Sequence, residues 1–250
     1  MARKKVTKKD SETLPLLFSD ENEWQDDSGW PEYDQLPYNF GSKKVGTSVF
    51  SDLLDSPSPL VITGYASLEK VIELLANHFK KGHKDPKVRL LFGNEPTLSR
   101  NAMEMRLEPL PLEQEMRDYW VEKNINPLQI VNLFESIRYI ESGVVEVRLP
   151  KSPNRVIHAK IYVGSETCTL GSSNFTNAGL KNNIEGNVRF QKKAGTKNWK
   201  INTEKLAECI WNEGKDGTDL FLELLRDLRR EVDWQTALAR ACHEVLGDEW

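Results

Sequence analysis

The chain has 250 residues, a formal net charge of −4 and 29% charged residues, which suits a soluble protein of one or two domains. No apolar run reaches the ~20 residues of a membrane span, and no hydrophobic signal region follows Met1. The three cysteines, Cys168, Cys209 and Cys242, lack metal-ligand spacing, and their odd number argues against a disulfide framework. We therefore expect a reduced, cytoplasmic protein that uses no membrane, metal or cofactor.

Residues 1–42 are expected to form a flexible or strapping N-terminal arm. Their apolar residues show no helical or strand period, and an acidic, polar run extends from Asp20 to Asp34. Several aromatic residues could fasten the arm to the folded body or to a partner: Trp24, Trp30, Tyr33, Tyr38 and Phe40. The basic tip could contact nucleic acid or remain solvated; it consists of Arg3, Lys4, Lys5, Lys8 and Lys9.

The globular part is expected to begin near Val45, with a catalytic domain over residues 43–200. A short helix over Val49–Leu54 precedes a buried strand over Leu60–Thr63. Leu68–Phe79 carries apolar residues at helical spacing, and Val88–Phe92 is the next predicted strand. A strand, a helix and a strand within about thirty residues favour a βαβ crossover. The predicted fold class is α/β, with a mixed β-sheet flanked by helices.

Further elements follow a polar loop that contains several prolines. Helices are predicted over Leu112–Lys123 and Pro127–Glu141, and a strand over Val144–Leu149. Beyond residue 200, Thr203–Trp211 and Asp219–Leu246 have helical patterns. Residues 201–250 are therefore expected to form a C-terminal helical segment that packs on the domain or leads to a further one.

The stretch around which the chain is organised begins with Val156–Val163, an alternating run typical of a half-buried strand. Since residues two apart on a strand share a face, His158 and Lys160 are expected to point the same way. A turn and a returning strand over Thr167–Leu170 follow. This hairpin would bring Gly171–Asn174 close to the histidine and the lysine.

These side chains form a set suited to phosphate chemistry. The imidazole of His158 can attack phosphorus or carry a proton near neutral pH. The ammonium of Lys160 can neutralise non-bridging oxygens, and Ser172 and Asn174 can donate hydrogen bonds to them. A His-x-Lys spacing alone is usually incidental, but a Gly-Ser-x-Asn on the following strand makes chance the less favoured explanation.

The pattern His-x-Lys followed by Gly-Ser-x-Asn resembles the signature of the phospholipase D superfamily. The continuation Ser172–Glu185 reads SSNFTNAGLKNNIE. It is similar to a branch of phospholipase-D-like nucleases that includes restriction-type endonucleases and the N-terminal domains of some bacterial helicases. The resemblance implies a phospholipase-D-like fold, with one His-x-Lys motif in the chain.

The chain departs from that family pattern at two points. Ser165 stands where the family has an Asp five residues after the lysine, and the gap to Gly-Ser-x-Asn is one residue short. Glu185, on a strand predicted over Ile184–Phe190, is the expected replacement carboxylate that orients His158. The alternative is a structural carboxylate that pairs with Lys181 or Arg189.

A second His-x-Lys, at His78 and Lys80, is followed by Asp85 at the family's spacing. These residues fall at the end of a predicted helix, where residues two apart do not share a face. No Gly-Ser-x-Asn follows. We interpret this second match as a basic cluster at a helix C-terminus.

Positive charge is concentrated around the motif, because residues 148–200 contain ten Lys or Arg and two Glu. Such a zone suits a polyanion, since phosphate contacts dominate nucleic-acid affinity; an exposed, solvated loop explains it equally well. A basic loop is predicted over Lys192–Lys200, and its candidates for backbone contacts are Lys192, Lys193, Lys197 and Lys200. The expected substrate-binding set is Ser173, Lys181, Lys192 and Lys193.

The resemblance implies a metal-independent nuclease that forms a phosphohistidine on His158. Two facing His-Lys motifs are needed, so the single motif implies a homodimer with a composite site. The expected substrate is DNA, with RNA left open, and the expected setting is restriction or phage defence. Lipid hydrolysis by the same chemistry is less favoured, because no amphipathic interfacial helix is present. The alternative is a catalytically weak nucleic-acid-binding or scaffolding module that serves a helicase partner.

Overall fold

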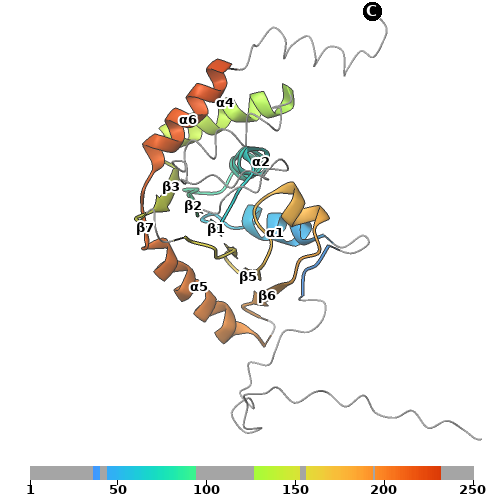
Figure 1. Cartoon of the computed structure of the whole chain (residues 1–250). Coiled ribbons are helices and arrows are strands. Elements are labelled where there is room, and N and C mark those ends of the chain that lie inside the picture. Colours follow the sequence, from blue (N-terminus) through green and yellow to red (C-terminus); the bar gives the residue numbers. More distant parts are fainter. Residues whose placement is uncertain (1–35, 40–43, 94–126, 153–155, 194, 232–250) are drawn as a thin grey trace, which may run out of the picture.

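The computed structural model describes residues 36–39, 44–93, 127–152, 156–193 and 195–231, and Figure 1 shows how their helices and strands are arranged. Most of the expected N-terminal arm lies outside the described residues. The same holds for the helix expected over Leu112–Lys123 and for the end of the one expected over Asp219–Leu246.

Within the described residues the strands form one seven-stranded sheet in the order β6-β5-β4-β1-β2-β3-β7. The strands are β1 (Leu60–Thr63), β2 (Val88–Phe92), β3 (Val145–Pro150), β4 (Ile161–Val163), β5 (Thr167–Gly171), β6 (Asn187–Gln191) and β7 (Gly214–Asp216). β1, β2 and β3 are parallel neighbours. β4, β5, β6 and β7 are antiparallel to their neighbours. The predicted mixed sheet is confirmed.

The helices are α1 (Val45–Leu54), α2 (Leu68–Lys80), α4 (Pro127–Glu141), α5 (Lys197–Trp211) and α6 (Thr218–Glu231), with a π-helical turn η2 (Ala178–Asn182). α2 connects the parallel strands β1 and β2, which confirms the predicted βαβ unit. Its apolar stripe buries Leu68, Val71, Ile72 and Leu75, because helical spacing places them on one side. Among the described residues, none of the helices is both long and apolar enough to cross a bilayer.

Helices cover the two faces of the sheet unequally, as Figure 1 shows. α1, α2, α4 and α6 enclose the larger core, into which Leu75, Val147 and Phe221 are packed. α5 lies on the opposite side over a smaller core that contains Ile62 and Trp211. All four residues of β1 are buried, because this central strand is covered on both faces.

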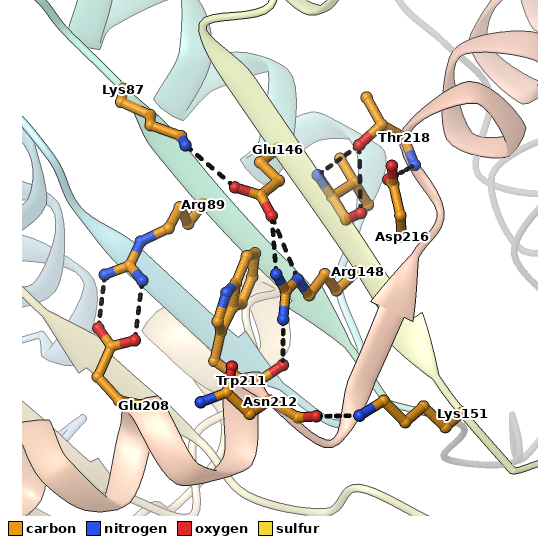
Figure 2. A network of polar contacts seen from close by, with 11 residues as sticks. Lys87, Arg89, Glu146, Arg148, Lys151, Glu208, Trp211, Asn212, Asp216 and Thr218 are labelled. Atoms are coloured by element: carbon orange, nitrogen blue, oxygen red, sulfur yellow. Dashed lines mark hydrogen bonds and ion pairs between the residues drawn. The ribbon is translucent and has the colours of Figure 1, made fainter.

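A charged network holds the end of α5 against β2 and β3 (Figure 2). The guanidinium of Arg148 lies 4.4 Å from the centre of the Trp211 ring and donates to the Trp211 carbonyl at 3.1 Å. Arg89 lies 5.4 Å from the same ring and forms a bidentate ion pair with Glu208. Two guanidinium groups from neighbouring strands thus lie against one indole and hold the end of α5 to the sheet. The domain boundary expected at residue 200 therefore falls within a helix that is bound to the sheet.

Four expected elements differ from the structure. The strand expected over Val156–Val163 is limited to β4, because its neighbour β1 ends at Thr63 and turns away towards α2. The strand expected over Ile184–Phe190 begins only at Asn187, opposite the last residue of β5. The basic loop expected over Lys192–Lys200 already enters α5 at Lys197. The interruption expected near Asp216 is the edge strand β7, which pairs with β3.

Candidate active site

The candidate site lies at the edge of the sheet where the parallel strands β1 and β2 end. Gly64 and Gly93 follow these strands directly. A Cβ added to Gly93 would lie 1.9 Å from the carbonyl oxygen of Ile157 and 2.9 Å from the Cα of Gly64. The segment before β4 passes so close to Gly93 that there is no room for a side chain at that position. The crossing places His158 at the carboxyl ends of parallel strands, where α/β sheets bind their ligands.

His158 and Lys160 differ in their exposure. His158 is exposed, whereas Lys160 is buried with a relative exposure of 3%. The Lys160 ammonium donates to the carbonyl oxygen of His158 at 3.0 Å, so its charge lies beside the histidine backbone. The expectation that both side chains point the same way stays a prediction, and the pair lies on the irregular segment before β4 rather than on a strand.

The Gly-Ser-x-Asn segment reaches the same edge through β5. The amide of Gly171 donates to the carbonyl oxygen of Lys160 at 3.1 Å, which joins the segment directly to the His-x-Lys segment. The side-chain oxygen of Asn174 accepts from the Thr63 hydroxyl and from the Tyr65 amide, each at 3.2 Å. Asn174 is therefore anchored to the end of β1. The predicted proximity of the two motif halves is confirmed by these contacts.

Ser172 and Glu185 form a hydrogen-bonded pair at this edge. The Ser172 hydroxyl donates to one carboxylate oxygen of Glu185, and the side-chain amide of Asn183 donates to the other at 3.3 Å. The Gly186 amide donates to the Ser172 oxygen at 3.1 Å. Glu185 belongs to the loop before β6. The proposed orientation of His158 by Glu185 stays a prediction, and the structure adds Ser172 as a partner of the carboxylate.

Ser173, expected to bind substrate, has a fully buried side chain. Its hydroxyl oxygen accepts from Asn187 at 3.0 Å, and its carbonyl oxygen accepts from the Tyr162 hydroxyl at 2.6 Å. Burial raises the pKa of Tyr162, so the phenol stays protonated and remains a donor. We correct the expectation for Ser173: its side chain supports the loop from within.

The expected lysine set separates into two groups. Lys181 is exposed on η2, a turn that packs on Asn174, since a Cβ on Gly179 would lie 2.5 Å from the Asn174 carbonyl oxygen. Lys192 lies at the other end of β6, where its amide donates to the Glu166 carbonyl and its ammonium pairs with the Glu166 carboxylate at 3.2 Å. β6 continues for four residues from Asn187 to Gln191, so its two ends are about 13 Å apart.

Lys192 and Lys193 therefore lie beyond the end of β6 that is remote from Asn187, so any contact that they make with a substrate lies away from the His-x-Lys segment. Two other cations of residues 148–200 are paired within the fold. The Lys200 side chain is buried and bonds to the Ser165 carbonyl and to Glu204. Arg189 forms a bidentate pair with Asp52, at 2.6 and 2.7 Å, across β6 and α1. Arg189 thus pairs with an acid other than Glu185.

The second His-x-Lys lies at the end of α2, as predicted, but its histidine is not part of an exposed basic cluster. His78 is fully buried, and its Nε2 lies 2.8 Å from the carbonyl oxygen of Ser56. Burial lowers its pKa, so the ring is neutral and Nε2 donates to that carbonyl. Lys80 is exposed at the end of α2, so the histidine and the lysine lie in different environments.

Several supporting residues were not anticipated from the sequence. Thr63, Asn183 and Asn187 each hold a motif residue through a side-chain hydrogen bond. Asn39 donates to the carbonyl oxygens of Gly179 and Asn183 at 2.9 Å, so the described part of the arm straps the site loop. The signals available in the sequence were the glycines after β1 and β2 and the polar end of an otherwise apolar strand.

The mixed sheet carries an exposed imidazole, a buried lysine ammonium, and serine and asparagine side chains on hydrogen-bonded neighbouring segments, which are residue types suited to phosphate chemistry. The model of the family described as "Cardiolipin synthase, PLD-like domain" matches residues 58–206. The chain belongs to this family and thus to the phospholipase D superfamily. None of the curated proteins matches the chain significantly.

The chain is also similar to several solved structures. Nuc, a phospholipase D family member from Salmonella typhimurium, is 17% identical, with a TM-score of 0.46 over 73% of this chain and 95% of that one. NucT from Helicobacter pylori is 13% identical, with a TM-score of 0.40 over 68% and 89%. The phosphatidylserine synthase of Haemophilus influenzae Rd KW20 is 12% identical, with a TM-score of 0.49 over 78% and 44%.

Proposed function

We propose that this chain is a nuclease that hydrolyses phosphodiester bonds of DNA through a phosphohistidine on His158. The observation that carries the proposal is the hydrogen bond from the Gly171 amide to the Lys160 carbonyl oxygen, which joins the Gly-Ser-x-Asn segment to the His-x-Lys segment. Membership of the phospholipase D superfamily supports the reaction class.

The proposed chemistry assigns one task to each group. The His158 imidazole attacks phosphorus, an N–P bond forms, and the bond from phosphorus to the leaving oxygen breaks. Lys160 and the amide N–H groups of Asn174 stabilise the charge on the non-bridging oxygens. Water then attacks phosphorus, and the N–P bond breaks. Lysine charge supplies the neutralisation, so we propose that cleavage proceeds without added metal.

A second imidazole must protonate the leaving oxygen and then activate the water. Within the described residues, His78 is buried against Ser56, and His83 binds the carbonyl oxygen of Leu54 at 2.7 Å. Both are committed to the turn between α1 and β1. We therefore propose that His158 of a second copy supplies the acid, in a homodimer with a two-fold axis at the site.

The proposed substrate is DNA, with RNA as the alternative polymer. Lys160 and Lys181 place positive charge near the site, which favours a polyanion. The resemblance of Ser172–Glu185 to the branch containing restriction-type endonucleases supports a role in restriction or phage defence. A catalytically weak nucleic-acid-binding or scaffolding module for a helicase partner is the second candidate, because the Ser172 hydroxyl already donates to Glu185.

The test is cleavage of supercoiled plasmid and single-stranded DNA in EDTA, with wild type and His158→Ala in parallel. We expect cleavage by the wild type, none by the variant, and equal DNA binding by both. Acid-quenched protein incubated with ³²P-labelled DNA should retain label only when His158 is present. Binding without cleavage in the wild type would refute the nuclease and favour the binding module. Turnover of a phospholipid instead of DNA would refute the substrate class. Sedimentation measures the dimer directly.

A further inference from the structure

The hydroxyl of Thr63 lies at the centre of the contacts that hold Asn174. Thr63 is the last residue of β1 and is fully buried. Its oxygen lies 2.6 Å from the Tyr65 carbonyl oxygen, 3.2 Å from the Asn174 side-chain oxygen and 3.1 Å from the Phe175 amide nitrogen. One hydroxyl therefore joins the end of β1 to the two residues that follow Ser173.

The donors and acceptors fix how the Asn174 amide is oriented. The Phe175 N–H donates to the Thr63 oxygen, and the single Thr63 proton is shared between the Tyr65 carbonyl and the Asn174 oxygen. The Tyr65 N–H also donates to that Asn174 oxygen at 3.2 Å. Two donors thus specify oxygen at this corner of the amide.

This orientation decides what the amide offers to an anion. An asparagine that presents its N–H groups can donate to phosphoryl oxygens, whereas a flipped amide would present its oxygen and repel them. Preorganised donors contribute because they need no reorientation during the reaction. The flipped state is disfavoured because the amide N–H groups would then face two donors, the Tyr65 N–H and the Thr63 hydroxyl.

We propose that Thr63 is a positioning residue that sets the Asn174 amide for phosphoryl binding. The proposal rests on the nuclease function proposed above, in which Asn174 contacts the substrate. Thr63 does not contact substrate itself; it acts through Asn174. The same hydroxyl accepts from the Phe175 amide and so also fixes the backbone that carries Asn174.

The test compares Thr63→Val, which removes the hydroxyl at nearly constant shape, with Thr63→Ser, which keeps it. Thr169→Val is the matched control, because Thr169 is a buried threonine on β5 whose hydroxyl has no hydrogen-bond partner within the described residues. In EDTA we expect Thr63→Val to lower kcat for DNA by ~10- to 100-fold. Thr63→Ser should restore most of the rate, and Thr169→Val should match the wild type. All rates are measured below the onset of unfolding of each variant.

A double-mutant cycle with Asn174→Ala separates positioning from general structural damage. If Thr63 acts through Asn174, adding Thr63→Val to Asn174→Ala costs little further rate. The proposal is overturned if the double variant loses the product of the two single rate factors, because the residues then act independently. A wild-type kcat for Thr63→Val would overturn it as well. A wild type that does not cleave, or cleavage that survives His158→Ala, would remove the proposed function and this role with it. Normal His158-dependent cleavage by Thr63→Val would remove the positioning role alone.

Discussion

Gly93→Ala tests whether the crossing at the sheet edge sets the position of His158. The added Cβ would lie 1.9 Å from the Ile157 carbonyl oxygen, and Cβ contacts below 3.0 Å essentially do not occur. Relief to 3.0 Å requires a movement of about 1.1 Å, which falls on backbone adjacent to His158. Since a misplacement of about 1 Å can cost about 100-fold in rate, we expect kcat to fall by ~100-fold.

The control is Gly217→Ala, whose Cβ would lie 2.7 Å from the Leu149 side chain. This substitution crowds the end of β3 against a flexible side chain and leaves the His158 backbone in place. It should reduce the melting temperature while kcat changes by less than about threefold. Plasmid cleavage in EDTA and thermal unfolding are measured on both variants. A folded Gly93→Ala protein with wild-type kcat would refute the reasoning.

Three further predictions concern charge and support around the site. Lys181→Ala should weaken DNA binding and reduce the slope of its salt dependence by about one phosphate contact. Lys193→Ala, beyond the other end of β6, should change neither. Equal losses of affinity for both variants in a salt titration would contradict the position of Lys181 near the site. Asn39→Ala should lower the free energy of unfolding by about 1–3 kcal/mol, because two carbonyls lose their donor; unchanged urea denaturation would contradict the strap. Burial lowers the pKa of His78, so the unfolded chain binds a proton on this ring more readily than the folded chain does. The free energy of unfolding should therefore fall as the pH drops below 6.5, the ordinary pKa of histidine. His78→Gln should lose this dependence in denaturation measured between pH 5 and 8.

The parts of the fold that the sequence predicted are those set by local apolar pattern. Leu60–Thr63, Val88–Phe92 and Pro127–Glu141 match the observed elements residue for residue, because strong apolar runs or helical stripes lie between clear breakers. The end of a strand depends instead on where its neighbour stops. The segment before Ile161 alternates like a strand, but β1 ends at Thr63, and no neighbour on that side continues the ladder.

The candidate site was predictable in its motif residues but not in its supports. His158, Lys160, Ser172 and Asn174 carry a recognisable pattern, whereas Thr63 and Asn187 are ordinary polar residues until the sheet brings them beside the motif. Charge was the least reliable guide. A count along residues 148–200 leaves out acids that lie elsewhere in the sequence. Asp52 pairs with Arg189, and Glu204 pairs with Lys200.

The departure at Ser165 shows how position in the fold changes the meaning of a motif residue. His158 precedes β4 and Ser165 follows it, so the strand separates the two along its length. The Ser165 hydroxyl shares a hydrogen bond with Ser56 at 3.0 Å, and its carbonyl oxygen accepts from the buried Lys200 ammonium at 3.0 Å. These contacts attach the hairpin tip to the α1–β1 turn and to α5. Ser165 therefore anchors the hairpin in this chain, at the opposite end of β4 from His158.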